Sequence, residues 1–233
     1  MYYNLRFLAI EFLKLIPFYI SVVLYFSLVR QDQVWTLWTS ALRCLPIMAL
    51  MFYVSIKGLS IKKHYGQSQL ILIGLMFSCA GDVMFNLLLF ALGMTCFGAT
   101  QICYMFAFGW RPLKIIIGAC LHISSIGLIY FVIGHLNIAH LIGVFIYCTL
   151  ITGMFWRSLA RALHVKSFLA FFAAVGAALF IISDALAAVI HILHVKLPAP
   201  RLQIMITYYA AQFAIALSTA DEGRPPAALG SEQ

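Results

Sequence analysis

The chain has 233 residues, of which 64% are hydrophobic and only 9% are charged, and its formal net charge is +8. An ordinary soluble domain carries roughly 25% charged residues, so this composition excludes a soluble globular protein. The basic residues fall in short loops between apolar runs, which is typical of contact with an anionic membrane leaflet and not of a nucleic-acid-binding surface. We therefore expect an all-α, polytopic membrane protein that binds no nucleic acid.

Runs of about 20 apolar residues are long enough to cross a bilayer as helices. They predict one domain of eight transmembrane helices over residues 1–220, followed by a disordered cytoplasmic tail over residues 221–233. Only residues 91–94 separate the third run from the fourth, and we predict a tight turn there, with one long kinked helix as the alternative. The eight segments are residues 7–29, 36–56, 69–90, 91–110, 113–133, 138–156, 168–193 and 203–220.

The basic residues predict the orientation of this bundle. Three of them, Arg30, Lys196 and Arg201, lie at one set of segment ends, and eleven lie at the other. Because cytoplasmic loops carry the excess of lysine and arginine, both termini are predicted to be cytoplasmic, which agrees with an even number of spans. The eleven are Arg6, Lys14, Lys57, Lys62, Lys63, Arg111, Lys114, Arg157, Arg161, Lys166 and Arg224.

Two of the seven acidic residues, Asp82 and Asp184, lie inside apolar runs. An ionisable side chain at the middle of a membrane helix costs about 2.5–3.5 kcal/mol, so a chain that keeps two of them is expected to use them. A glycine precedes each aspartate by eight residues, and the third and seventh segments run in the same direction. Each aspartate is expected about eight residues from the lumenal end, which predicts one depth for both carboxyls. A purely structural role is the alternative.

Other polar side chains are predicted to reach the same layer. Arg43 lies about seven residues into the second segment and Gln101 about ten into the fourth, while Tyr208 and Gln212 share one face of the eighth. Long polar side chains in hydrocarbon need partners, which the bundle interior supplies. We expect one internal pocket lined by Asp82, Asp184, Arg43, Gln101, Tyr208 and Gln212.

Several of these polar residues have a plainer alternative role. Arg43 is either a substrate ligand or the structural counter-ion of one aspartate. Interhelical hydrogen bonding is the alternative for Asn86, Ser78, Ser183 and Gln212. The histidines lack metal-site spacing, the cysteines form no C-x-x-C pair, and there is no glycine-rich phosphate loop, so we expect neither a metal nor a cofactor.

Stretches along nearly the whole chain resemble one family. The most distinctive are residues 176–184, which end in Phe-x-x-Ser-Asp, and residues 207–212, which contain Tyr-Tyr-x-x-Gln. Together with weaker matches at residues 14–18, 41–46, 74–82 and 104–113, they resemble the YhhN-like lysoplasmalogenases, and most of all the animal members of that family.

This resemblance implies a reaction. The family's animal members hydrolyse the vinyl ether bond of choline or ethanolamine lysoplasmalogens in the endoplasmic reticulum membrane, giving a fatty aldehyde and a glycerophospho-alcohol. The family's two membrane aspartates correspond to Asp82 and Asp184. Relatives often carry a histidine where this chain has Gln101, three residues before Tyr104. A neutral amide is no proton donor at neutral pH, so either this position is not the obligatory acid or this member is altered in activity.

A vinyl ether is cleaved by acid: the carbon distal to oxygen is protonated, water adds to the resulting oxocarbenium ion, and the hemiacetal collapses. Two carboxyls in one low-dielectric pocket hold a single proton between them and supply both an acid and a base. Phe180 and Ala188 share the helix face of Asp184 and make it dry, so we assign Asp184 as the acid and Asp82 as the base.

The remaining candidate residues are assigned to the lysophospholipid substrate. We expect Arg43 or Lys14 to pair with the lipid phosphate, and Tyr208 or Tyr209 to face a choline ammonium. Partners beyond the substrate and the surrounding membrane lipids, including the oligomeric state, are left open. The full set of candidate substrate-binding residues is Arg43, Lys14, Asn86, Gln101, Tyr104, Tyr208, Tyr209 and Gln212.

Two other functional classes are compatible with the same features. Paired membrane carboxyls and a pseudo-repeat are also typical of proton-coupled transporters of lipids or small molecules. The apolar segments lack glycine–proline breaks in corresponding positions, which argues against that class. The third class is a structural or lipid-sensing protein without turnover.

Overall fold

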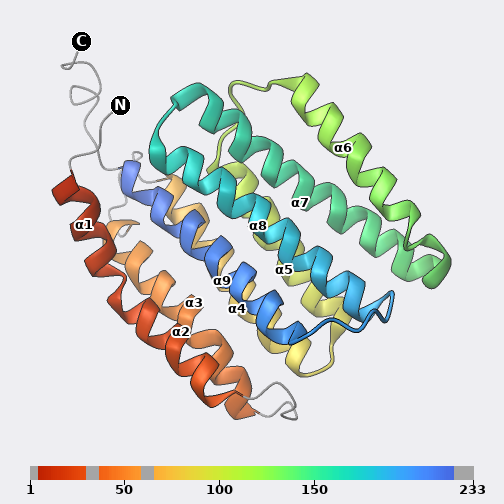
Figure 1. The fold of residues 1–233 in the computed structure, drawn as a ribbon. Coiled ribbons are helices and arrows are strands. Elements are labelled where there is room, and N and C mark those ends of the chain that lie inside the picture. The colour runs from red at the N-terminus through yellow and green to blue at the C-terminus, as the bar shows by residue number, and fades with distance from the viewer. Residues whose placement is uncertain (1–4, 30–36, 59–65, 223–233) are drawn as a thin grey trace.

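A computed structural model describes residues 5–29, 37–58 and 66–222, and the regular elements in this part of the chain are all helices, which confirms the predicted all-α class (Figure 1). Two short 3-10 helices, η2 and η3, follow α6 and α9. The elements are α1 (Leu5–Lys14), α2 (Ile16–Leu28), α3 (Leu37–Gly58), α4 (Gly66–Asn86), α5 (Phe90–Ala107), α6 (Ile115–Tyr130), η2 (Ile133–His135), α7 (Ile138–Val165), α8 (Phe168–His191), α9 (Pro200–Leu217) and η3 (Ser218–Asp221).

Within the described ranges, five helices are long and apolar enough to cross a membrane: α3, α4, α5, α7 and α8. Helices α1 and α2 meet at an angle of 47°, ahead of Pro17, and together they would make a sixth span. Helix α6 is shorter, with 16 residues, and α9 falls below the same threshold. Each predicted segment thus corresponds to a helix or to the bent pair, while the number of eight spans stays a prediction.

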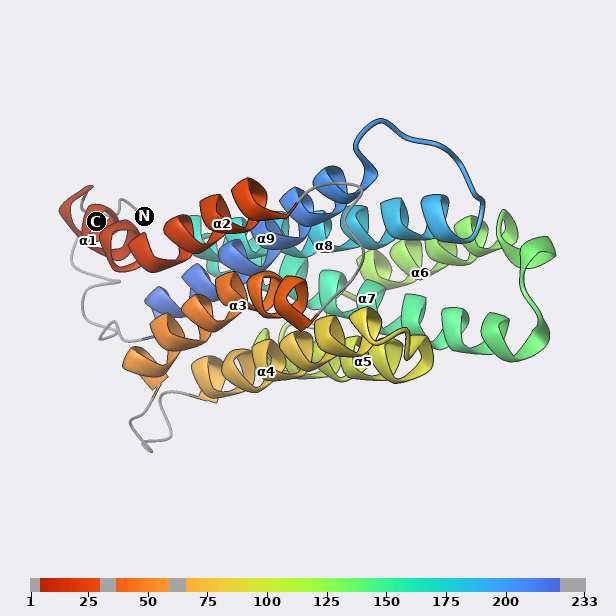
Figure 2. The ribbon, with the colours of Figure 1, turned by 90° about the horizontal axis from the view of Figure 1, so that it is seen from below.

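The helices pack in two layers. In the view of Figure 2, α2, α9 and α8 lie above α3, α4 and α5. Helix α4 packs against α3 and α5, α8 packs against α9 and α7, and α7 also contacts α5. Helix α6 lies at the edge of the bundle against α7, and its Ile116 and Ile123 side chains are 81% and 70% exposed. Exposed apolar surface of this kind is typical of a lipid-facing helix.

The tight turn predicted after the third segment is confirmed, but its position was wrong by four residues. Helix α4 ends at Asn86, and Leu87–Leu89 form the turn, with Leu88 in the left-handed conformation (φ 60°). A run of leucines without glycine or proline gives no sequence signal for this break. Asp82 therefore lies four residues before the end of α4, whereas Asp184 lies seven before the end of α8.

Helix α7 continues well beyond the predicted segment 138–156, to Val165. Its length of 28 residues corresponds to about 42 Å, which exceeds the roughly 30 Å hydrocarbon layer. Arg157 lies in this extension, where its guanidinium donates to the carbonyl oxygens of Gly109, Pro112 and Leu113 at 2.7, 2.9 and 3.2 Å. The extension thus holds the loop between α5 and α6.

Two residues assigned to the tail, Asp221 and Glu222, lie with the helical bundle. The Glu222 carboxylate accepts hydrogen bonds from the backbone N–H groups of Gln67 and Ser68 at 2.7 and 2.6 Å, which caps the start of α4. Asp221 accepts from the hydroxyl of Ser167, at the start of α8, at 2.7 Å. The rest of the tail, residues 223–233, lies outside the described residues, as do Arg30, Lys62, Lys63 and Arg224 of the orientation argument.

Candidate intramembrane site

Asp82 is completely buried on α4 and both of its carboxylate oxygens have partners. The Arg43 Nε atom, on α3, lies 2.8 Å from Oδ1, and the Tyr208 hydroxyl, on α9, donates to Oδ2 at 2.8 Å. The structure thus brings three predicted site residues together, and Arg43 acts as the counter-ion of Asp82. An ion pair of this kind compensates the charge that a buried carboxylate carries.

A one-way chain of hydrogen bonds ends at Asp82. Because Tyr208 gives its single proton to Asp82, its oxygen accepts from Ser78, 2.6 Å away. Ser78 in turn accepts from Nε2 of Gln212 at 2.7 Å, and Oε1 of Gln212 accepts from the Tyr104 hydroxyl at 2.7 Å. Every donor in the chain points towards the carboxylate, so α4, α5 and α9 together stabilise its negative charge.

The predicted head-group roles of the tyrosines have no support in this geometry. Tyr208 and Tyr209 are only 3% and 2% exposed, and the Tyr209 hydroxyl donates to the backbone oxygen of Arg43 at 2.9 Å. Asn86 donates to the Ser40 hydroxyl at 2.5 Å, which joins the end of α4 to α3. These side chains build the surroundings of Asp82 and present no open face to a ligand.

Asp184, on α8, has very different neighbours. It is only half-buried, and its Oδ2 atom accepts a short hydrogen bond from the Tyr147 hydroxyl on α7. Among the described residues no cation forms an ion pair with it. Sequence reasoning missed Tyr147, although a tyrosine hydroxyl inside an apolar run needs a partner, and that requirement was the available signal.

Gln101 belongs with Asp184 and not with the Asp82 group. It is fully buried on α5, and its amide lies beside the Tyr147 hydroxyl. Neither the oxygen nor the nitrogen of that amide has a hydrogen-bond partner in the part of the chain that the structure describes. The predicted single pocket is therefore two adjacent groups, one around each aspartate.

Aromatic rings connect the two groups. The ring centroids of Phe97, Phe180 and Tyr208 lie 5.7 to 6.3 Å apart. Phe180 lies one turn before Asp184, Phe97 one turn before Gln101, and Tyr208 binds Asp82. The immediate surroundings of the two carboxyls differ: Asp82 is ion-paired with Arg43, whereas Asp184 has the Tyr147 hydroxyl as its partner.

Lys14 does not lie in this site. It pairs with Glu11 at 2.9 Å, and Glu11 also forms an ion pair with Lys57 and accepts from the Tyr53 hydroxyl at 2.7 Å. Lys57 and Arg43 lie on the same helix, α3, about 21 Å apart at 1.5 Å per residue. The structure thus places Lys14 at the opposite end of α3 from Arg43, too far for a shared phosphate contact.

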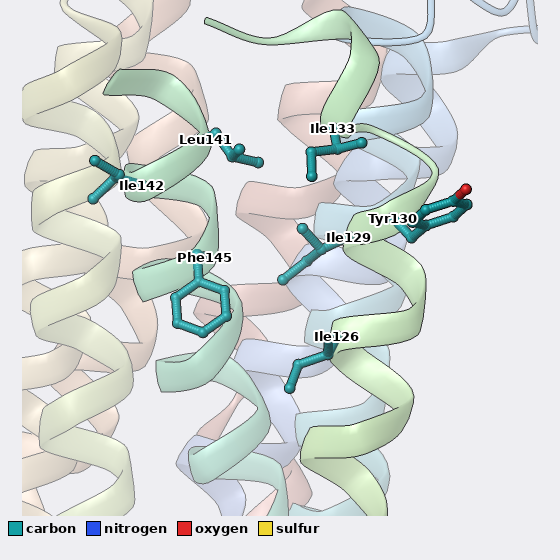
Figure 3. Close-up of a pocket in the computed structure, with 7 residues that line it drawn as sticks. All are labelled: Ile126, Ile129, Tyr130, Ile133, Leu141, Ile142 and Phe145. Atoms are coloured by element: carbon teal, nitrogen blue, oxygen red, sulfur yellow. The ribbon is translucent and has the colours of Figure 1, made fainter. Parts of the chain in front are cut away.

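An apolar cavity of about 430 Å³ lies between α6 and α7 (Figure 3). It contains no charged side chain. Tyr147 follows Phe145 by two residues, which is about 200° around α7, so this cavity and Asp184 lie on opposite faces of that helix. The residues that line the cavity are Ile126, Ile129, Tyr130, Ile133, Leu141, Ile142 and Phe145.

Within residues 5–29, 37–58 and 66–222, no group of three or more histidine, cysteine, aspartate or glutamate side chains is arranged so that it could hold a metal ion. The polar groups that the structure shows at the site are two carboxyls, their hydrogen-bond donors and one arginine. Apolar helices around such a group define an integral membrane protein with an intramembrane polar site.

The chain belongs to the YhhN family, whose model matches residues 38–219. Among the relatives, the bovine (Bos taurus) lysoplasmalogenase TMEM86A is 36% identical over 220 residues, covering 91% of this chain and 90% of the relative. The human (Homo sapiens) lysoplasmalogenases TMEM86A and TMEM86B are 31% and 32% identical, over 91% and 87% of this chain and 90% and 84% of their own lengths. No solved structure matches the chain significantly.

Proposed function

We propose that this protein is a lysoplasmalogenase, which hydrolyses the vinyl ether bond of choline or ethanolamine lysoplasmalogens to a fatty aldehyde and a glycerophospho-alcohol. Relatives with that name match the chain over most of its length. The observation that carries the proposal is the pair of intramembrane carboxyls with opposite surroundings, since acid cleavage needs a proton donor next to a fixed negative charge.

We infer a role for each aspartate from its surroundings. Arg43 balances the charge of Asp82, whereas Asp184 forms no ion pair among the described residues and keeps its proton, because an unpaired charge among apolar helices is costly. Asp184 is also the more accessible of the two, since Asp82 is fully buried and Asp184 is half-buried. We therefore assign Asp184 as the acid that meets the substrate.

In the proposed reaction, Asp184 transfers its proton to the vinyl carbon distal to oxygen. The fixed charge of Asp82 stabilises the oxocarbenium ion, and water adds to its carbon while giving a proton back to Asp184. The hemiacetal then collapses as the hydroxyl proton passes to the leaving oxygen. Both Asp82 oxygens are occupied by Arg43 and Tyr208, so the geometry favours Asp184, and not Asp82, as the base that takes the proton of water.

The test uses purified protein in detergent with a choline lysoplasmalogen, and aldehyde release is the readout. Asp184→Asn keeps the size of the side chain but removes the acid, so kcat is expected to fall by about 10²- to 10⁴-fold. Asp82→Asn is expected to lose activity as well, since the cation loses its stabilising charge. Full turnover of Asp184→Asn contradicts the acid assignment, and proton flux in liposomes without aldehyde release supports a carrier instead.

The membrane arrangement completes the proposal. We infer eight spans with both termini cytoplasmic, in the endoplasmic reticulum membrane, and a lysophospholipid that enters from the bilayer. The distribution of basic residues and the match of each predicted segment to a helix support this arrangement. Asp82 and Asp184 then lie nearer to the lumenal ends of their helices.

A further inference from the structure

We propose that Tyr147 is a positioning residue for the acid of the reaction: its hydroxyl holds one oxygen of Asp184, so that the acidic proton stays on the other oxygen, towards the substrate. This inference rests on the proposed function and deepens it. It concerns a side chain on α7, a helix that carries none of the residues predicted for the site.

Tyr147 is in direct contact with the proposed acid. Tyr147 donates a short hydrogen bond to Oδ2 of Asp184, and in the described structure this is the sole hydrogen bond of that carboxyl. An oxygen that already accepts a hydrogen bond is the poorer place for the acidic proton, because two hydrogens would then face each other. Only Oδ1 remains for that proton, and its direction is therefore fixed by Tyr147.

The other aspartate has a comparable tyrosine contact. Asp82 also accepts from a tyrosine hydroxyl, that of Tyr208, and the Gln212 amide stands behind this tyrosine through Ser78. Asp184 likewise accepts from a tyrosine hydroxyl, that of Tyr147, and the buried Gln101 amide lies beside this hydroxyl without a serine between them.

The difference between the two groups lies in the cation. Arg43 pairs with Asp82 and no cation pairs with Asp184, so the same tyrosine contact supports a fixed charge at one site and an oriented acid at the other. Tyr147 is thus placed to orient the proton donor and not to bind the lipid itself.

The experiment compares Tyr147→Phe with Tyr25→Phe in the full-length protein. Tyr25 is the control, because its side chain is buried and its hydroxyl has no hydrogen-bond partner among the described residues, so the same substitution breaks no hydrogen bond there. Tyr147→Phe is expected to lower kcat for lysoplasmalogen about 10- to 100-fold, the usual effect of losing a hydrogen bond to a charged or reacting group, and to leave KM within about twofold. Tyr25→Phe is expected to match the wild type.

A double variant separates positioning from a merely structural effect. If Tyr147 acts through Asp184, adding Tyr147→Phe to Asp184→Asn lowers the residual rate no further. The same fold-loss in both backgrounds overturns the inference. A spectroscopic check is independent of turnover: the infrared C=O stretch of the protonated Asp184 carboxyl, identified by its loss in Asp184→Asn, is expected to shift in Tyr147→Phe and not in Tyr25→Phe.

The possible failures are distinguishable. If the wild type releases aldehyde and Tyr147→Phe has the wild-type kcat, only the role of Tyr147 falls and the proposed function stands. If the infrared band of Asp184 does not shift in Tyr147→Phe, the hydrogen bond between the two side chains is contradicted, and so is the inference that rests on it. If the wild type releases no aldehyde, the proposed function falls, and the catalytic role of Tyr147 falls with it.

Discussion

At the scale of single residues, Asp82 and Asp184 have the same side chain but different chemistry. Asp82 is sealed and balanced by Arg43, with a chain of donors directed at it, whereas Asp184 is half-buried with one phenol as its partner. In the proposed reaction, the charge of Asp82 favours the neutral, proton-bearing form of Asp184, since neighbouring carboxylates repel each other. The proposed division of roles between the two aspartates therefore comes from neighbouring side chains on other helices.

Removal of Arg43 is expected to destabilise the protein strongly. Arg43→Met keeps much of the apolar stem but leaves the buried Asp82 carboxylate without its counter-ion, at a cost of about 3–5 kcal/mol in the free energy of unfolding. The measurement is denaturant unfolding in detergent, followed by circular dichroism. The double variant with Asp82→Asn is the control: it removes the charge as well and is expected to recover most of the loss. Equal instability of the single and double variants contradicts the ion-pair argument.

The sequence identified some of these residues and missed others for physical reasons. Asp82, Asp184, Arg43 and Gln101 stand out because a charge or an amide inside an apolar run is rare. Tyr147 does not stand out, since tyrosine is amphipathic and occurs commonly in apolar segments. Pairings between helices also depend on rotation about the helix axis, which segment counting does not determine, so one pocket was expected where the structure has two groups.

At the scale of helices, the glycine that precedes each aspartate by eight residues has a packing role. A Cβ atom at Gly74 would lie 2.3 Å from the Tyr104 ring, and one at Gly176 would lie 2.7 Å from Cβ of Ala214 and 2.9 Å from the Ala211 oxygen. The two glycines therefore lie where α4 packs closely against α5 and α8 packs closely against α9. The shared spacing in the sequence thus reflects how each aspartate helix meets its partner helix.

Gly176→Ala is expected to destabilise the protein by about 1–3 kcal/mol, because the added methyl group meets the backbone of α9 and the helices must separate. Gly143→Ala is the matched control, since a Cβ at that position on α7 meets nothing within 4 Å. Alanine there is expected to be neutral or to stabilise by up to about 1 kcal/mol through helix propensity. Unfolding in detergent measures both, and an equal response of the two variants would refute the packing argument.

Helix boundaries were predictable only where the sequence contains a strong signal. Ser167, which caps α8 through the Ala170 backbone N–H at 3.0 Å, and Asn137, which caps α7, mark helix starts clearly. The turn at Leu87–Leu89 has no such residue. Residues 157–166 contain several basic side chains and therefore resemble a loop, although α7 continues through most of this stretch, to Val165. Arg157 is held there by carbonyl contacts, which no local pattern reveals.

At the scale of the whole molecule, the polar contacts lie at two levels of the bundle. Near one end, Glu11 joins Lys14 and Lys57, Glu222 caps α4, and Asp221 binds Ser167. Towards the other end of α3 and α4 lie Arg43 and Asp82. The first level connects α1, α3, α4, α8 and η3 and fixes the bundle, so the proposed catalytic level is supported by an independent set of contacts.

The proposed orientation makes a prediction for the loops. The sequence contains no N-x-S/T glycosylation site, so any N-glycosylation that is detected must come from the inserted site. A flexible insert carrying one sequon between α8 and α9, at residues 192–199, is expected to be glycosylated in cells, because this loop faces the lumen in the proposed topology. The same insert between α5 and α6, at residues 109–114, is expected to stay unmodified. A gel-mobility shift that endoglycosidase reverses is the measurement.

Both inserts share one design and differ only in their loop, so each is the control of the other. Modification of the α5–α6 insert alone reverses the orientation and places the aspartates nearer the cytoplasm. Modification of both inserts contradicts the expected count of three spans between these loops, because an odd number of crossings puts them on opposite sides of the membrane. Since glycosylation occurs in the endoplasmic reticulum lumen, modification of the α8–α9 insert alone supports the proposed location and orientation together.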